Sequence, residues 1–311
     1  MGTPEFAAIC LKEILNSPHK VVAVVSAAGK PAGRGQKIQQ PAVAKLAINE
    51  NLKLMQPIRL KDPAFIEELK SLQADIFVVV AFRMLPKEVW QIPPKGTFNL
   101  HASLLPQYRG AAPINWAIIN GEKESGVTTF LIDEQIDTGN LLLSQKVEID
   151  EQDNAGTLHD KLAEVGKKLI ISTIDGLADC SIRPRPQQKL SELKPAPKIF
   201  KEDCQIDWDM PIERIHDFIR GLSPYPAAWT VLRKEGDSRT IKIFGGNFVR
   251  INNPDKFHKR ISFDENQLII RLKDGNYCVE ELQPEGKKRM KSSDFINGIH
   301  DKTGWYVGQM S

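Results

Sequence analysis

The chain has 311 residues, of which 41% are hydrophobic and 26% are charged. This length suits two average domains, and the composition is that of a globular protein, not of a disordered one. The formal net charge is +3, with an isoelectric point near 8.5, which is compatible with an RNA partner without requiring one. The longest apolar run, residues 76–82, is too short to cross a bilayer, so we expect no membrane association.

The N-terminal half alternates apolar strand patterns with helical ones. Residues 21–26 and 75–81 are continuous β-branched runs, as in strands that are covered on both faces. Helices are expected at 41–51, at 62–72, where Asp62-Pro63 gives a cap followed by proline, and at 155–178. This alternation predicts an α/β domain with a doubly wound, mostly parallel sheet.

The composition changes at residues 182–204, where prolines and lysines alternate and no apolar period survives, so this segment is interpreted as a linker. A helix at 211–222 and several short strands with turn signals follow, which favours a small barrel. The strands are expected near 227–232, 239–251, 260–263, 267–272 and 276–282. The predicted domains are therefore 1–181 and 205–311, joined by 182–204.

Asn99 and His101 stand two positions apart in an extended stretch, so their side chains share one face of a strand. Buried polar groups cost free energy unless they are paired, and the ends of strands are where α/β sheets place their chemistry. A lone histidine is more often a satisfied core residue. A second segment, 127–139, weakens that alternative because it reads as a strand followed by a loop that carries Asp137, which could return beside His101. Asp137 could also simply cap a turn.

Four cysteines lie far apart, at positions 10, 180, 204 and 278, without a C-x-x-C spacing. Neither a zinc site nor a redox motif is indicated, and we expect no metal. Reduced thiols, together with a start that lacks a signal-peptide pattern, favour a cytoplasmic location.

Four short motifs together resemble the folate-dependent formyltransferases. They are Asn99-x-His101, Ser103-Leu104-Leu105-Pro106, Tyr108-Arg109-Gly110 and Asp137-Thr138-Gly139. The segments 2–7, 31–35 and 110–114 further resemble the branch of that family whose acceptor is a charged transfer RNA. The resemblance covers nearly the whole chain and is thinner after residue 230. It implies a formyltransferase (Rossmann-like) catalytic domain and a C-terminal barrel like an oligonucleotide-binding (OB) fold.

The implied reaction moves a formyl group from N10 of 10-formyltetrahydrofolate to the α-amine of methionine on initiator tRNA. The resemblance makes Asn99 and His101 donors to the formyl oxygen, and Asp137 the residue that holds the His101 tautomer and relays the amine proton. Such donors and proton relays are ordinary devices of acyl transfer. The implied folate contacts are Ser103, Leu104, Leu105, Pro106, Phe82 and Arg83. The Phe82-Arg83 pair departs from the commoner family pattern.

Two basic segments are expected to contact tRNA phosphates. The first is the glycine-rich loop around Lys30, Arg34 and Lys37, and the second is Lys287, Lys288 and Arg289. On local sequence alone both would be ordinary solvated surface. In the first, Ala28-Gly29 replaces the usual Pro-Asp that precedes the loop in the family.

The sequence begins at the first βα turn, whereas a doubly wound domain has a central strand ahead of that turn. We therefore expect a short apolar strand upstream of Met1. Two other functions stay open. One keeps the chemistry but uses an amino-sugar nucleotide or another small amine as acceptor, and the other is an RNA-binding module without catalysis. We expect the protein to be a monomer.

Overall fold

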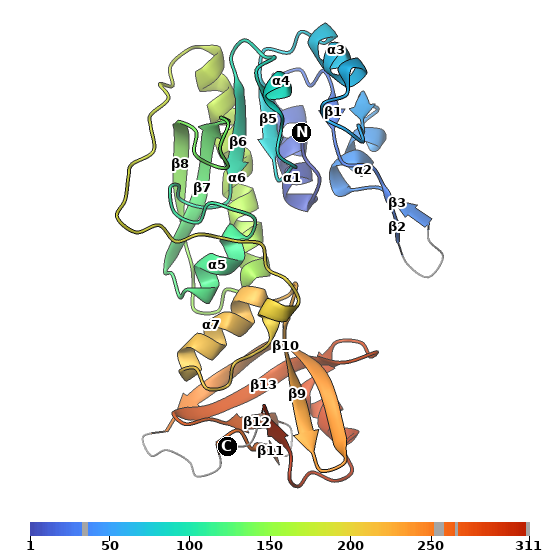
Figure 1. Ribbon diagram of the computed structural model, residues 1–311, viewed down its shortest axis with the longest axis vertical. Helices are drawn as coiled ribbons and strands as arrows, with labels where there is room; N and C mark the ends of the chain where they lie inside the picture. The colour runs from blue at the N-terminus through green and yellow to red at the C-terminus, as the bar shows by residue number, and fades with distance from the viewer. Residues whose placement is uncertain (33–36, 252–257, 265–266, 309–311) are drawn as a thin grey trace. The chain divides into compact units, whose positions relative to one another are not determined.

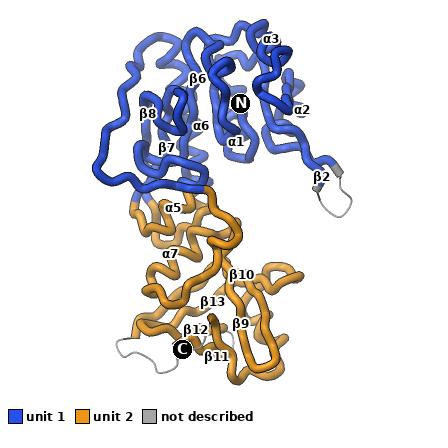
Figure 2. The backbone as a smooth tube through the Cα atoms, in the orientation of Figure 1, with its two compact units in different colours: residues 1–113, 124–148, 159–197 blue, residues 114–123, 149–158, 198–311 orange. Residues whose placement is uncertain are grey.

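The computed structural model describes residues 1–32, 37–251, 258–264 and 267–308, which form two compact units (Figures 1 and 2). Unit 1, blue in Figure 2, comprises residues 1–113, 124–148 and 159–197. Unit 2, orange, comprises residues 114–123, 149–158 and 198–311. The expected fold class is confirmed, with an α/β sheet in unit 1 and an antiparallel barrel in unit 2.

The sheet of unit 1 is parallel in its first part and antiparallel at one edge. Strand β5 (Phe77–Val80) pairs in parallel with β6 (Thr97–His101), and β1 (Val24–Val25) pairs in parallel with β4 (Leu54–Met55). Beyond β6 the direction changes. The antiparallel members are β7 (Glu124–Leu131) and β8 (Leu141–Glu148). The sheet is thus mixed, because β7 runs antiparallel to both β6 and β8.

The helices expected in the N-terminal half are confirmed. They are α2 (Ala42–Asn49), α3 (Pro63–Ser71) and α6 (Ala155–Ala178). Asp62 caps α3 by accepting from the Ala64 amide at 3.0 Å, as its position before proline predicts. The remaining helices of this half are α1 (Glu5–Leu15), α4 (Lys87–Trp90) and α5 (Pro113–Ile119). A short hairpin of β2 (Lys30–Ala32) and β3 (Lys37–Gln39) is also present.

Met1 and Gly2 occupy a strand position between β1 and β5. The amine of Met1 donates to the Val78 carbonyl at 2.7 Å, and the Met1 carbonyl accepts from the Val80 amide at 2.9 Å. On the other side, the Gly2 amide donates to the Val25 carbonyl at 3.0 Å. Burial lowers the pKa of the Met1 amine to about 5, because no water stabilises its charge.

A cavity of about 470 Å³ continues from Met1 along the same two strands. Its lining includes residues 21–25 from the β1 side and 74–78 from the β5 side, and it is mostly apolar. The expected strand ahead of Met1 stays a prediction.

Unit 2 is a barrel against which helices α7 and α8 pack. The strands run in the order β11-β12-β13-β10-β9-β15, and β14 pairs with β13. The Ile261 amide donates to the Trp305 carbonyl at 2.9 Å, and the Val307 amide donates to the Lys259 carbonyl at 2.9 Å, which joins the two edges. The strands are β9 (Ala228–Lys234), β10 (Asp237–Arg250), β11 (Ile261–Asp264), β12 (Gln267–Arg271), β13 (Gly275–Pro284), β14 (Met290–Lys291) and β15 (Tyr306–Val307). The helices are α7 (Ile212–Leu222), α8 (Ser292–Asn297) and the 3₁₀ turn η1 (Glu202–Cys204).

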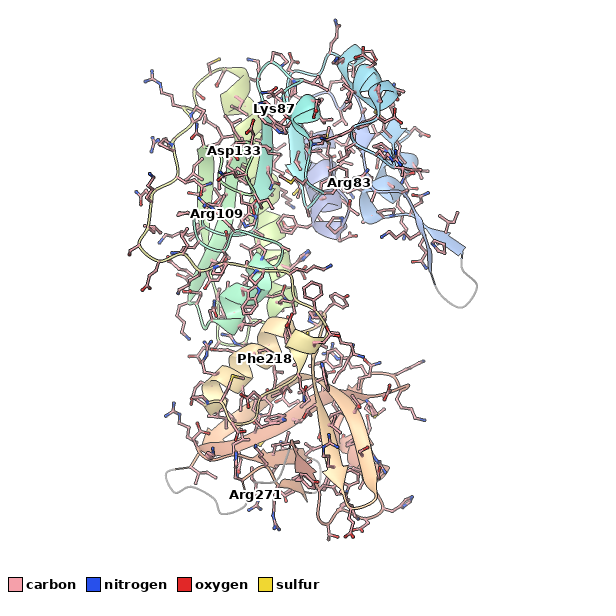
Figure 3. All side chains as sticks on the ribbon, viewed as in Figure 1. Arg83, Lys87, Arg109, Asp133, Phe218 and Arg271 are labelled. Atoms are coloured by element: carbon pink, nitrogen blue, oxygen red, sulfur yellow. The ribbon has the colours of Figure 1, made fainter. Side chains whose placement is uncertain are left out.

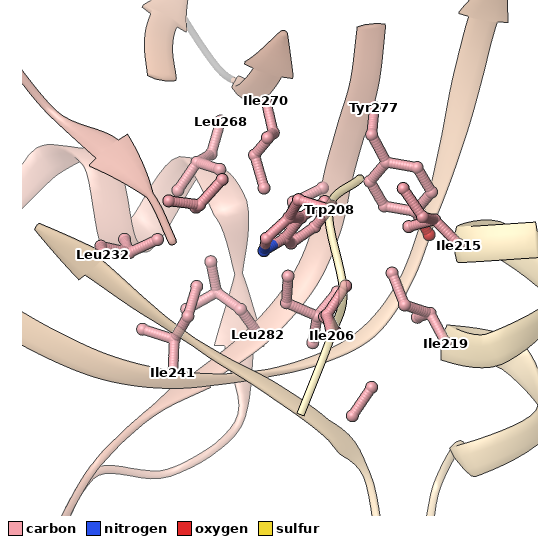
Figure 4. Packing of buried hydrophobic residues seen from close by; sticks show 14 of the residues in the cluster. Ile206, Trp208, Ile215, Ile219, Leu232, Ile241, Leu268, Ile270, Tyr277 and Leu282 are labelled. Carbon is pink, nitrogen blue, oxygen red and sulfur yellow. The ribbon is translucent and has the colours of Figure 1, made fainter. Parts of the chain in front are cut away.

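The core of unit 2 forms between the barrel strands and the apolar face of α7. Ile215 and Ile219 of α7 are fully buried in the same cluster as Trp208 and Tyr277 (Figure 4). Trp208 donates from its indole Nε1 to the Thr230 hydroxyl at 2.9 Å, so its polar atom is satisfied within the core.

Candidate active site

Asn99 and His101 lie on β6, between a parallel neighbour, β5, and an antiparallel one, β7. Their shared face follows from the two-residue period of a strand. His101 is only 6% exposed, and Asn99 is half-buried. The spacing in the sequence therefore predicts correctly that both residues occupy one strand.

The tautomer of His101 is set by a main-chain carbonyl. Its Nε2 lies 2.8 Å from the carbonyl oxygen of Tyr108, which can only accept, so Nε2 carries the proton. In the neutral ring Nδ1 then has a lone pair and can accept a proton. The resemblance assigned the choice of tautomer to Asp137, whereas in the structure the Tyr108 carbonyl occupies the nitrogen that decides it. The resemblance also made His101 a donor to the formyl oxygen, but the neutral ring in this tautomer has no second N–H to donate, so its free Nδ1 fits a proton acceptor.

Asp137 returns to His101 from the loop after β7, as the sequence suggested. Its Oδ2 lies 3.8 Å from His101 Nδ1 and accepts from the main-chain amide of Gly110 at 3.0 Å. The side chain of Asp137 is 12% exposed. A positive charge on the ring would therefore face a carboxylate that is itself held by a hydrogen bond.

Gly110 is required by its backbone and by its surroundings. Its φ is +126°, and a Cβ added there would lie 2.3 Å from the carbonyl oxygen of Ala196. Asp137 is also in the left-handed region, with φ of +56°, where aspartate is tolerated better than most side chains. The close approach of the two loops depends on both conformations.

Two buried polar atoms near the site have no partner within the described part of the chain. They are the Oδ1 of Asn99 and the Nε of Arg109. A buried acceptor without a donor costs free energy, and a ligand N–H that reached the Oδ1 of Asn99 would remove that cost. The amide of Asn99 therefore fits a substrate that presents an amine or amide beside a carbonyl.

The stretch Ser103–Pro106 forms the wall after β6. The Ser103 side chain is fully buried, and its hydroxyl donates to the Gln107 carbonyl at 2.7 Å. This hydroxyl therefore stabilises the loop and is not available to a ligand. Thr128 donates from its hydroxyl to the Ser103 carbonyl at 2.7 Å. Leu104 and Pro106 are half-buried, and Leu105 is buried. Any contact of this stretch with a ligand thus depends on main-chain atoms and apolar surface.

Phe82 and Arg83 follow β5 and support a neighbouring groove. Phe82 packs on the apolar cluster of β1, β4 and β5. Arg83 donates to the carbonyls of Pro57 and Ile58, the latter at 2.9 Å, so its guanidinium braces the loop after β4.

The groove beside this loop has a volume of about 410 Å³. It is lined by Leu60, Lys61, Met84, Leu85, Pro86, Lys87, Trp90, Asp133 and Glu134. Lys87 forms an ion pair with Glu134 at 2.5 Å. Asp133 lies next to Glu134 in the loop after β7 (Figure 3). Apolar walls with a few polar groups suit a flat heteroaromatic ligand.

The basic residues expected to contact RNA are only partly described. Lys30 is exposed on β2, Lys37 belongs to β3, and Arg34 lies outside the described residues. In unit 2, Lys287 and Lys288 are exposed, whereas Arg289 pairs with Glu281 and lies 4.3 Å from the Phe244 ring centroid. The two lysines are therefore better placed than Arg289 to meet a phosphate.

Three groups of the site have roles that the sequence did not predict. They are the Tyr108 carbonyl, the Gly110 amide and the side chain of Gln187, which contacts the Asp137 loop. Two are main-chain atoms, whose hydrogen bonds a sequence motif does not show. The third lies in a segment that the composition assigns to a linker.

The described residues contain no group of three or more His, Cys, Asp or Glu that could hold a metal ion. All four cysteines are free thiols. Where the chain is described, no helix is both long and apolar enough to span a membrane.

The chain combines a mixed α/β sheet, which brings an amide, an imidazole and a carboxylate together, with a barrel, and this arrangement suits a two-unit acyl-transfer enzyme. Family models agree: "Formyl transferase" matches residues 1–174, and "Formyl transferase, C-terminal domain" matches residues 198–300. The chain belongs to the formyl transferase family, which confirms the resemblance seen in the sequence.

Among curated relatives, the methionyl-tRNA formyltransferase of Bacteroides thetaiotaomicron is 45% identical over 309 residues, covering 98% of this chain and 96% of that protein. That of Flavobacterium johnsoniae is 48% identical over 299 residues, covering 96% and 95%. Among solved structures, an N-formyltransferase from Helicobacter canadensis, in complex with folinic acid and dTDP-3-aminofucose, has a TM-score of 0.63 at 22% identity and covers 93% of this chain and 97% of its own. The last likeness shows the fold alone.

Proposed function

We propose that this enzyme transfers the formyl group of 10-formyltetrahydrofolate to the α-amine of methionine carried by initiator tRNA. The relatives that are 45% and 48% identical over nearly the whole chain bear the name of this activity. The observation that carries the chemistry is the approach of His101 Nδ1 to Asp137 at 3.8 Å, beside the unpartnered Oδ1 of Asn99.

The carboxamide of Asn99 serves both partners of the reaction. Its Nδ2 donates to the formyl oxygen as that atom gains negative charge, and its Oδ1 accepts from the attacking amine. Because β6 fixes the main chain of Asn99 between two paired strands, its carboxamide needs little reorganisation when the charge develops. A preorganised donor of this kind contributes about 10²–10³ in rate.

His101 and Asp137 handle the proton. The amine nitrogen forms a bond to the formyl carbon, the bond from that carbon to N10 breaks, and the proton lost by the amine is returned to N10. His101 Nδ1 accepts this proton because its Nε2–H is already committed to the Tyr108 carbonyl. The imidazolium is stabilised by Asp137 until the proton leaves, and such acid–base assistance is worth ~10²–10⁴.

The folate is expected along Ser103–Pro106, with its flat ring near the groove behind Phe82 and Arg83. The tRNA is expected to meet Lys30, Arg34 and Lys37 in the N-terminal part and Lys287, Lys288 and Arg289 in the barrel. We propose that the protein acts as a monomer in the cytoplasm, with 1–181 as the catalytic domain, 182–204 as the connection and 205–311 as the RNA-binding domain.

The test is a formylation assay with purified protein, 10-formyltetrahydrofolate and methionyl initiator tRNA. We expect formylmethionyl-tRNA and tetrahydrofolate in equal amounts. The same assay with dTDP-3-aminofucose, the ligand of the Helicobacter canadensis protein, should give no product. Formylation of the sugar instead would favour a small-amine acceptor, and tRNA binding without folate turnover would favour a non-catalytic RNA-binding module.

A further inference from the structure

The segment expected to be a linker is fixed along the active-site loop over much of its length. We call residues 185–196 the strap. Its first residue, Arg185, exchanges two main-chain hydrogen bonds with Leu141, at 2.7 and 2.9 Å. Its last residue, Ala196, donates to the Arg109 carbonyl and accepts from the Ala111 amide, both at 2.8 Å. The two ends of the strap are therefore hydrogen-bonded next to the loops that carry Gly110 and Asp137.

Gln187 is the strap residue whose side chain reaches the Asp137 loop. Its Nε2 donates to the main-chain carbonyls of Asp137 and Gly139, both at 2.9 Å. Its Oε1 accepts from Arg109 Nη2 at 2.6 Å. Both donors and the acceptor of the amide are thus engaged, and the side chain is half-buried.

These bonds act where the loop needs external support. Asp137 has a φ of +56°, and Gly139 lies so close to β7 that an added Cβ would be 1.7 Å from the Leu131 carbonyl. A backbone in such a conformation persists only when its surroundings specify it. Gln187 binds the carbonyls of Asp137 and Gly139, on either side of Thr138. It thereby fixes the direction in which the Asp137 side chain points from the main chain.

We propose that Gln187 is a positioning residue that sets the distance between the Asp137 carboxylate and His101 Nδ1. This inference rests on the proposed function, since it assigns Gln187 to the proton-handling pair of that reaction. Gln187 touches neither reacting atom and acts only through Asp137. A glutamate at this position would keep the acceptor for Arg109 but would lose both donors to the loop carbonyls.

The test compares Gln187→Ala, Gln187→Glu and Gln107→Ala in the full-length protein. Gln107 is the matched control, because its side chain also makes two hydrogen bonds to the strap, to Glu192 and Lys194, without contacting Asp137. We expect both Gln187 variants to lower kcat by up to about 10²-fold with little change in KM, as a misplaced catalytic group does. Gln107→Ala should keep kcat while loosening the same strap.

A double-mutant cycle with Asp137→Ala separates this proposal from the proposed function. If Gln187 acts through Asp137, Gln187→Ala causes no further loss of kcat in the Asp137→Ala background. An equal loss in both backgrounds, an unchanged kcat in Gln187→Ala, or an equal loss in Gln107→Ala would overturn the positioning role alone. A normal kcat in Asp137→Ala would instead remove the catalytic role of Asp137, and the role of Gln187 with it.

Discussion

The main-chain amide of Gly110 donates to the carboxylate of Asp137 over 3.0 Å, and this contact joins the two loops of the site. The two residues are far apart in the sequence, and both have a positive φ. The geometry of the candidate catalytic set therefore depends on the conformation of a glycine that does no chemistry itself.

Gly110→Ala should reduce both stability and turnover. The added Cβ would meet the Ala196 carbonyl oxygen at 2.3 Å, and φ of +126° is strained for alanine. We expect a loss of roughly 1–3 kcal/mol in the free energy of unfolding, measured by denaturant titration, and a fall in kcat. The control is Gly236→Ala, with φ of +74° and open space around the Cβ, which should keep kcat. Equal kcat for the two variants would show that the approach of the loops is unimportant.

Replacing Lys287 and Lys288 with alanine should weaken tRNA binding and leave folate use unchanged. Each lost phosphate contact reduces the slope of log K against log salt by about 1, so the double variant should lose about 2. Binding is measured by titration at several salt concentrations. Arg289→Ala should have a smaller effect, because its guanidinium is already paired with Glu281. An unchanged slope in the double variant would remove this cluster from the RNA path.

Filling the cavity beside Met1 should stabilise unit 1. A fusion of a few Val or Ile residues ahead of Met1 would extend the strand position between β1 and β5, and its peptide N–H would replace the buried amine at the Val78 carbonyl. Each buried side chain is worth about 1.5–3 kcal/mol in the free energy of unfolding. A Gly-Ser extension of equal length is the control. The same stability for the apolar and Gly-Ser fusions would mean that the cavity does not accept a strand.

The stability of the protein should decrease in acid through His216. This side chain lies on α7 against the Phe248 ring, and burial, followed by the Arg220 charge, lowers its pKa below the ordinary value of 6.5. At pH values below 6.5 the unfolded chain therefore binds more protons than the folded one. The contribution of His216 to the free energy of unfolding is fully present above pH 6.5 and is lost as the pH falls below that value. Denaturant unfolding across this range measures the effect.

His216→Gln should flatten that pH dependence, whereas replacement of His300, an exposed residue, should leave it unchanged. If His216→Gln keeps the full slope, the acid sensitivity has another source.

The parts of the fold that the sequence predicts are those with a repeating pattern or a local capping signal. The repeat of apolar residues along α6 predicts its bounds, and the Asp62-Pro63 pair predicts the start of α3. The spacing of Asn99 and His101 predicts their common face. The fixed position of the strap has no such signal, because Gln187 reaches Asp137 across 50 positions through an irregular, proline-rich segment. The Tyr108 carbonyl that sets the His101 tautomer is a main-chain atom, and it leaves no mark on the sequence either.

The claim on which the rest depends is that Asn99 and His101 act on the reacting groups themselves, Asn99 on the formyl oxygen and His101 on the proton of the attacking amine. Its most direct test is the single-turnover rate of formyl transfer to methionyl-tRNA by Asn99→Ala and His101→Ala, with folate and tRNA both saturating. We predict rates lower by about 10²–10³ for Asn99→Ala and 10²–10⁴ for His101→Ala, with unfolding free energies near that of the parent protein. A near-normal rate in either variant would contradict the role assigned to that residue.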